Sequence, residues 1–197
     1  MTNRKTPFAN GEYYHVYNRG VDKRDIFIDR RDIERFMQSM KFFNSPVPIG
    51  SIYWLSLKNK KFSGPTAKSK KIVEFIAYCL NPNHYHFILC QLQDGGISEF
   101  MKRLGGYSWY FNNRYKRTGA LFQGKFKAVH VNSNEYLLHV SSYVNLNDSV
   151  HRFSGPTAKL SKSSWEEYMD EKPGGFCNKD VILSQFKGSD DYTKFAQ

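Results

Sequence analysis

The chain has 197 residues and a formal net charge of +11, so it is long enough for one substantial core and predicts a polyanionic partner. No apolar run approaches the ~20 residues of a membrane-spanning helix, and the basic N-terminus lacks the apolar segment of a secretory signal, so we expect neither a membrane protein nor a secreted one. The three cysteines, Cys79, Cys90 and Cys177, are widely spaced, which argues against a disulfide framework or a cysteine zinc site and predicts a reducing, cytoplasmic compartment.

The first part of the chain predicts a strand, a helix and a second strand. Residues 12–20 alternate as a strand that ends at a glycine. Asp29 can cap a helix whose apolar residues recur at helical spacing as far as residue 43. Residues 49–57 have the composition of a strand, and the lysine-rich residues 58–71 that follow predict a basic surface loop or hairpin tip.

Two histidines open the next pair of strands. Residues 72–80 predict a buried strand, and the turn residues 81–83 lead from it into a strand that begins at His84. Because strand side chains alternate between faces, His84 and His86 share a face, where two imidazoles can bind one cation or one phosphate. The ordinary alternative is a half-buried strand with two polar residues on its solvated face.

The second half predicts two helices around a further strand. Ser98 can cap a long helix that runs to about Arg117, although Gly105-Gly106 weakens it by ~1 kcal/mol per glycine. Residues 122–131 predict a strand. Asn132, with a glutamate three residues later, resembles a capping box that opens a helix as far as about residue 147, and two short helices follow in the tail.

This order of elements predicts an α+β fold with a ferredoxin-like split β-α-β antiparallel sheet, in which the first strand lies beside the histidine strand. The last helix of the sheet domain carries Tyr143 and Asn147, spaced by one turn, and we expect it near the sheet face of His84 and His86. The sequence therefore predicts a cluster of two imidazoles, a phenol and a carboxamide.

Phosphodiester cleavage through a covalent tyrosine requires such groups. A tyrosine hydroxyl, with a pKa of about 10, is a poor nucleophile unless the phosphate that it attacks is polarised. A divalent ion held by His84 and His86 can polarise that phosphate, and Asn147 can supply a third ligand. Neutral nitrogen and oxygen ligands suit Mg²⁺ or Mn²⁺.

Several motifs resemble one protein family. Residues 83–87, Asn-His-Tyr-His-Phe, resemble the histidine–hydrophobic–histidine motif of the HUH single-strand endonucleases. Residues 14–20 resemble the opening strand of the REP-associated tyrosine transposases, a single-tyrosine branch of that superfamily. The matches to later motifs of the branch, and to its C-terminal extension, lie at residues 121–129, 143–147, 165–168 and 183–195.

The resemblance implies that Tyr143 is the nucleophile, forming a 5′-phosphotyrosine and releasing a 3′-hydroxyl. It makes His84 and His86 metal ligands, with Asn147 as the third. The family usually has Asn-Pro where this chain has Asn147-Asp148, so Asp148 is an alternative ligand. The implied partner is single-stranded DNA with palindromic hairpins and an adjacent guide sequence, bound by a monomer or homodimer of a bacterial cytoplasmic protein that joins the nucleoid when bound to DNA.

We expect residues 1–150 to form the HUH nuclease domain, with an inserted basic loop at about 58–71, and residues 151–197 to form a linker and a helical extension. Residues 62–68 recur identically as residues 153–159, which we interpret as a repeat inserted twice at sites that the fold tolerates. The expected DNA contacts, each of which is as often a solvated surface residue, are Arg4, Lys5, Arg19, Lys23, Arg24, Arg103, Arg114, Lys116, Arg117, Lys125 and Lys127.

Two alternatives remain beside this hypothesis. One is a protein of the same fold that binds DNA hairpins without cutting them. The other is a ferredoxin-like RNA-binding module whose sheet aromatics stack on bases, although the paired histidines on the sheet face argue against it.

Overall fold

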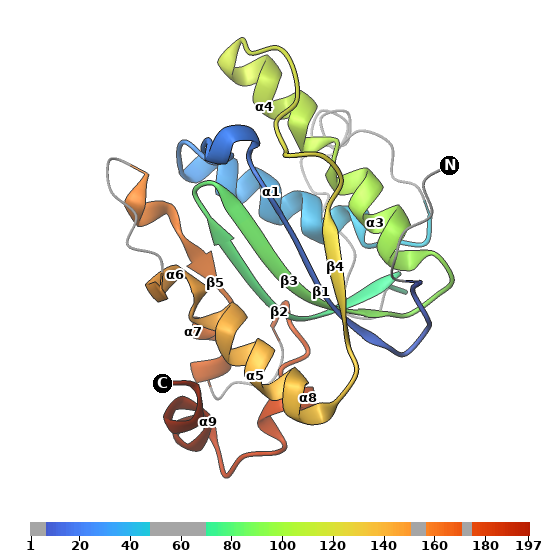
Figure 1. The fold of residues 1–197 in the computed structure, drawn as a ribbon, viewed down its shortest axis with the longest axis vertical. Coiled ribbons are helices and arrows are strands. Elements are labelled where there is room, and N and C mark those ends of the chain that lie inside the picture. The colour runs from blue at the N-terminus through green and yellow to red at the C-terminus, as the bar shows by residue number, and fades with distance from the viewer. Residues whose placement is uncertain (1–6, 48–69, 151–156, 171–174) are drawn as a thin grey trace, which may run out of the picture.

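The computed structural model describes residues 7–47, 70–150, 157–170 and 175–197. Its centre is an antiparallel sheet in the order β4-β1-β3-β2-β5 (Figure 1). The predicted α+β fold with a ferredoxin-like strand order is confirmed, including the first strand beside the histidine strand at the centre. The strands are β1 (Tyr13–Arg19), β2 (Val73–Asn81), β3 (His84–Gln91), β4 (Lys127–Val131) and β5 (Lys162–Ser163).

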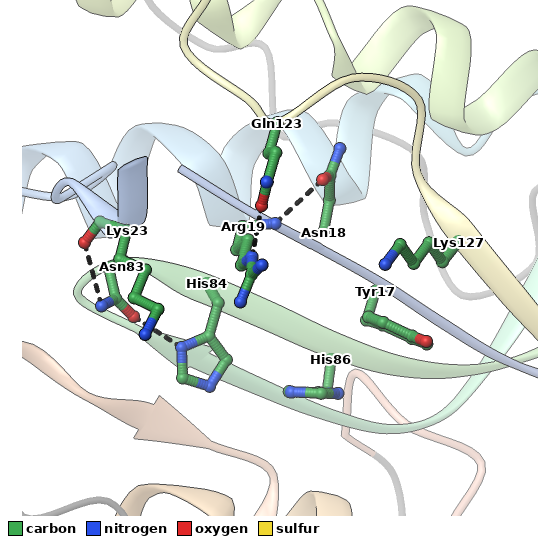
Figure 2. A pocket seen from close by; sticks show the side chains of 9 residues that line it. All are labelled: Tyr17, Asn18, Arg19, Lys23, Asn83, His84, His86, Gln123 and Lys127. Carbon is green, nitrogen blue, oxygen red and sulfur yellow. Dashed lines mark hydrogen bonds between the residues drawn. The ribbon is translucent and has the colours of Figure 1, made fainter. Parts of the chain in front are cut away.

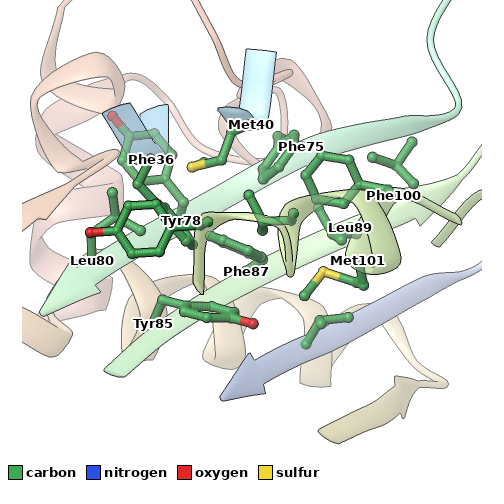
Figure 3. Close-up of a cluster of buried hydrophobic side chains, with 14 of the residues drawn as sticks. Phe36, Met40, Phe75, Tyr78, Leu80, Tyr85, Phe87, Leu89, Phe100 and Met101 are labelled. Atoms are coloured by element: carbon green, nitrogen blue, oxygen red, sulfur yellow. The ribbon is translucent and has the colours of Figure 1, made fainter. Parts of the chain in front are cut away.

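One face of the sheet is covered by three helices, α1 (Arg30–Phe43), α3 (Gly96–Leu104) and α4 (Tyr107–Tyr115) (Figure 1). The predicted cap of α1 is confirmed, because the Asp29 side chain accepts a hydrogen bond from the Asp32 backbone N–H. Aromatic rings fill the space between these helices and the strands (Figure 3), with Phe36, Phe75, Phe87, Phe100 and Tyr107 almost fully buried. This layer is the main hydrophobic core.

The other face is covered by α5 (Asn134–Asn145) together with the C-terminal segment. That segment contributes α7 (Trp165–Met169), α8 (Asp180–Leu183) and α9 (Ser189–Ala196), and its strand β5 pairs with β2. Leu137, Val140 and Val144 of α5 point inward as predicted. The sheet is therefore buried on both sides, and the face under α5 is the one that carries the histidines. The short elements η1 (Val21–Lys23), α6 (Asn147–Val150) and η2 (Ala158–Leu160) complete the described fold.

The prediction of one long helix from Ser98 to about Arg117 is wrong. Gly95, with φ +69°, precedes the first helix, which begins at Gly96 and ends at Leu104. At the two glycines the backbone hydrogen bonds span three residues and not four. They run from Gly106 N–H to Arg103 O and from Ser108 N–H to Gly105 O, both at 3.0 Å. Such i→i+3 bonds tighten the chain and break one helix into α3 and α4.

Two element boundaries also differ from expectation. Ser133, not Asn132, caps α5, since its Oγ accepts a hydrogen bond from the Tyr136 N–H at 3.2 Å. The strand expected over residues 122–131 is shorter, because β4 begins at Lys127 and Phe122 forms only an isolated bridge with Gly20. The expected strand 49–57, most of the basic loop 58–71 and the first repeat 62–68 lie outside the described residues, as does most of the second repeat.

No helix among the described residues is long and apolar enough to cross a membrane.

Candidate active site

The histidine strand lies beside β1, and Tyr17 of β1 is the register partner of His86. His84 and His86 project from the same side of β3 into a pocket of ≈ 460 Å³ (Figure 2). Its opening is basic, because three of the lining side chains are cationic and exposed. The pocket is lined by Tyr17, Asn18, Arg19, Lys23, Asn83, His84, His86, Gln123 and Lys127.

A short chain of hydrogen bonds determines which ring nitrogen of His84 carries the proton. The Lys23 carbonyl accepts from Asn83 Nδ2 at 3.1 Å, which sets the orientation of the Asn83 amide (Figure 2). Asn83 Oδ1 therefore faces His84 Nδ1, at 2.6 Å. Because a carboxamide oxygen only accepts, His84 Nδ1 is the donor, and whenever the ring is neutral its lone pair is on Nε2.

The side chain of Asn147 faces Nε2 of His84. Its Oδ1 lies 3.1 Å from His84 Nε2 and accepts a hydrogen bond from Asn81 Nδ2 at 2.8 Å. The side chain is fully buried, and Asn147 Nδ2 has no hydrogen-bond partner within the described chain. Two electron-pair donors held about 3 Å apart match adjacent ligands of an octahedral ion with bonds of about 2.1 Å. His84 and Asn147 thus fit Mg²⁺ or Mn²⁺.

His86 is held by a third histidine, on the neighbouring strand β1. His15 Nε2 of β1 lies 2.8 Å from His86 Nδ1, and the two rings stack with centroids 5.0 Å apart. Burial lowers the pKa of His15 to about 4, so this ring is neutral at pH 7. The contact occupies Nδ1 of His86 and holds the ring from the side of β1.

Tyr143 lies over these rings. Its own ring meets His86 edge-on at 5.5 Å and His15 at 6.0 Å between centroids. The side chain is 44% exposed, and its hydroxyl has no hydrogen bond to any residue that the structure describes. The phenol therefore combines proximity to the histidines with access from solvent. His139, one turn earlier, instead contacts Phe195 of α9.

The sequence predicted that Tyr143 and Asn147 lie on one helix, and this prediction is wrong. Helix α5 ends at Asn145, and Leu146, with φ −102° and ψ 9°, separates it from α6, which Asn147 opens. The chain thus bends between Tyr143 and Asn147, and Asp148 follows Asn147 where the sequence resemblance led us to expect a proline. The Asp148 carboxylate lies close to Cys79, and burial together with this carboxylate raises the pKa of the Cys79 thiol.

No three His, Cys, Asp or Glu side chains converge as a metal site in the described ranges. A metal at His84 and His86 therefore depends on the Asn147 amide for its third protein ligand. The observation that favours such a role is the buried Asn147 amide itself, whose oxygen lies 3.1 Å from His84 Nε2 while its nitrogen has no partner in the described residues.

The expected DNA contacts separate into groups. Arg19, Lys23 and Lys127 line the pocket. Arg103 donates to Glu99 and to two backbone carbonyls, and Arg114 pairs with Asp29 and Asp32, so both guanidinium groups bind the protein itself. The others are Arg24, Lys116, Arg117 and Lys125, which lie outside the pocket lining, and Arg4 and Lys5, which precede the described residues.

The sequence did not assign Tyr17, Asn18, Asn81, Asn83 or Gln123 to the site. Strand alternation already placed His15 and Tyr17 on one face of β1. The missing information was the register that sets Tyr17 opposite His86. Gln123 reaches the pocket through a loop, where it accepts a hydrogen bond from Arg19 Nε, and no periodic pattern marks that contact.

Comparison with known proteins agrees with this architecture. Residues 58–147 match the family model of IS200-like transposases. A solved REP-associated tyrosine transposase bound to a REP hairpin has the same fold, with a TM-score of 0.51 and 11% identity over 85% of each chain. A candidate transposase from Deinococcus radiodurans R1 aligns with a TM-score of 0.40 and 13% identity, over 73% of this chain and 95% of that one. No curated protein matches by sequence.

Proposed function

We propose, on the premise that residues 58–147 match the IS200-like transposases, that the chain cuts and rejoins single-stranded DNA through a covalent tyrosine intermediate. The observation that carries the proposal is the position of Tyr143, whose exposed ring lies against His86 while Asn147 meets His84. A nucleophile and a set of ligand atoms on one sheet face are what phosphoryl transfer to tyrosine requires.

In the proposed reaction the Tyr143 oxygen attacks the scissile phosphorus. The new tyrosine O–P bond forms as the bond from phosphorus to the 3′-oxygen breaks, and the tyrosine gives up its proton while the leaving 3′-oxygen takes one. The product is a 5′-phosphotyrosine and a free 3′-hydroxyl. Attack by a 3′-hydroxyl on this intermediate reverses the exchange, which joins strands and regenerates Tyr143.

The remaining residues would orient the phosphate. His84, His86 and Asn147 would hold a Mg²⁺ or Mn²⁺ ion, which supplies polarisation of the phosphate oxygens when bound. Arg19, Lys23 and Lys127 would neutralise neighbouring phosphates at the pocket opening. As substrate we propose single-stranded DNA with short palindromic hairpins, which the solved neighbour bound to a REP hairpin supports.

Incubation with labelled hairpin DNA and Mn²⁺ tests this function. We expect wild type to form an adduct that survives denaturing electrophoresis and Tyr143→Phe to form none while binding DNA equally well. Tyr136→Phe is the matched control, because Tyr136 is 36% exposed on the same helix and should still give the adduct. If wild type forms no adduct on any hairpin tried, the chain is a binding protein without this chemistry.

A further inference from the structure

Asn81, the last residue of β2, joins the two candidate ligand atoms described above. Its Nδ2 lies 2.8 Å from Asn147 Oδ1 and 3.0 Å from His84 Nε2, and these two atoms are 3.1 Å apart. The Asn81 side chain is fully buried. Three polar atoms therefore form a nearly equilateral triangle in the interior, contributed by β2, β3 and α6.

The triangle has the dimensions of one face of an octahedral ion. Adjacent ligands around a hard cation with bonds of about 2.1 Å lie about 3 Å apart, the spacing of all three sides. Two corners already present lone pairs, from Asn147 Oδ1 and from His84 Nε2. At the third corner the Asn81 amide presents hydrogen atoms, which satisfy the other two corners as a positive charge would.

An amide can exchange these roles with little change in shape. Half a turn about the last side-chain torsion replaces Asn81 Nδ2 by Oδ1 at the same corner. On the opposite side, Asn81 Oδ1 now accepts a hydrogen bond from Ser161 Oγ at 3.0 Å. A hydroxyl both donates and accepts, so Ser161 can accept from Nδ2 once the amide has turned, and the rotation gives up only the weak contact from Cys79 Sγ to Asn81 Oδ1, at 3.7 Å.

We propose that Asn81 is a further ligand of the divalent ion, binding through Oδ1 together with His84 and Asn147, and that Ser161 reverses its hydrogen bond as Asn81 turns. This inference rests on the metal site of the proposed function. It gives the ion a second amide oxygen and makes a residue of the C-terminal segment a positioning residue for it. It also explains why β2 ends in a buried asparagine facing the histidine hairpin.

Binding of Mn²⁺ to the DNA-free protein, followed by electron paramagnetic resonance, tests the inference apart from activity. We expect His84→Ala to abolish binding at this site and Asn81→Leu to weaken it about tenfold or more, by analogy with losses around metal sites. If Asn81 only donates hydrogen bonds, Asn81→Leu removes a group that opposes the cation, and the affinity stays equal or rises. Thermal unfolding and hairpin binding without metal verify that Asn81→Leu is folded.

A second measurement uses wild type and does not depend on any variant folding. In ¹⁵N-labelled protein, Mg²⁺ should move the side-chain NH₂ signals of Asn81 from a position against the His84 ring to one beside Ser161. The Asn145 side chain, which is bonded to Ser164 and Tyr192, serves as the reference that should stay unchanged. Unchanged Asn81 signals at saturating Mg²⁺ would overturn the inference alone, whereas wild type that binds no Mn²⁺ would overturn the metal site as well.

Discussion

His15 Nε2 and His86 Nδ1 lie 2.8 Å apart in a nearly solvent-free space, where β1 and β3 run side by side. The contact fixes the ring orientation of His86 from behind. Histidines that bind metals typically have their second nitrogen held in this way, and loss of the holding group costs about 10–100-fold in affinity or activity. We therefore expect His15 to act through His86 and not on the substrate.

We expect His15→Phe to reduce formation of the covalent DNA adduct about 10-fold or more. Phenylalanine keeps the ring packing against Tyr17 and Tyr143 but offers no nitrogen to His86. The measurement is the adduct rate as a function of Mn²⁺ concentration, and excess Mn²⁺ should restore part of it. His15→Gln, which retains a hydrogen-bonding group, should lose less. An equal loss in both variants that no amount of Mn²⁺ restores would indicate a packing role instead.

The same histidine makes stability depend on pH. Burial lowers the pKa of His15 from 6.5 to about 4, so between these values the unfolded chain binds a proton that the folded chain does not. Stability therefore falls as the pH falls from 6.5 towards 4, by about 3 kcal/mol for this group. Urea unfolding at pH 7 and pH 4.5 in the presence of a chelator measures the fall. His15→Phe should show a smaller one, and identical falls would contradict the assignment.

Arg114 is a structural residue on the evidence of its contacts. Its guanidinium bonds Asp29 and the fully buried Asp32, at 2.5 and 2.8 Å, and connects α4 to the start of α1. Arg114→Gln leaves the Asp32 carboxylate buried without its charged partner, and we expect a loss of about 3 kcal/mol in unfolding free energy. Arg30→Gln is the matched control, because the Arg30–Glu34 pair is exposed and should cost less than ~1 kcal/mol.

Lys127 and Arg103 provide a contrast for DNA binding. Lys127 is exposed at the pocket, whereas the Arg103 guanidinium is held by the Phe43 and Ser45 carbonyls. We expect Lys127→Gln to weaken hairpin binding and to reduce the slope of log affinity against log salt by about one, as for a lost phosphate contact. Arg103→Gln should leave that slope unchanged. The reverse result would move the DNA path away from the pocket.

The fold was predictable because its signals are local. Alternation marks β1 and β3, the aspartate cap marks α1, and the order of these elements admits few sheet topologies. The break at Gly105-Gly106 was not predicted, because the cost of about 1 kcal/mol for each glycine in a helix is small beside the apolar stripe that continues across both helices. Strand β5 has two residues and no period, so its pairing with β2 follows only from tertiary packing.

In the candidate site, the sequence motifs at residues 83–87 and 143–147 indicated His84, His86 and Tyr143, and the spacing of one helical turn from Tyr143 indicated Asn147. The roles of Asn81 and His15 depend on which atom faces which, and this follows from rotamers and from the register of three strands. A sequence carries no direct signal for either. The contacts of two expected DNA-binding residues carry little local signal either, since the carbonyls that hold Arg103 and the aspartates that hold Arg114 lie about 60 and 80 positions away along the chain.

The Asn145 side chain is one of the contacts that join α5, the helix of Tyr143, to the C-terminal segment. Asn145, two residues after Tyr143, accepts from Ser164 Oγ at 2.6 Å and donates to the Tyr192 hydroxyl at 3.0 Å, and all three side chains are fully buried. Chimaeras between this chain and another protein of the same fold should therefore transfer α5 and the tail as a unit. A tail from another parent would leave the Asn145 amide without its two hydrogen-bond partners, two residues from Tyr143.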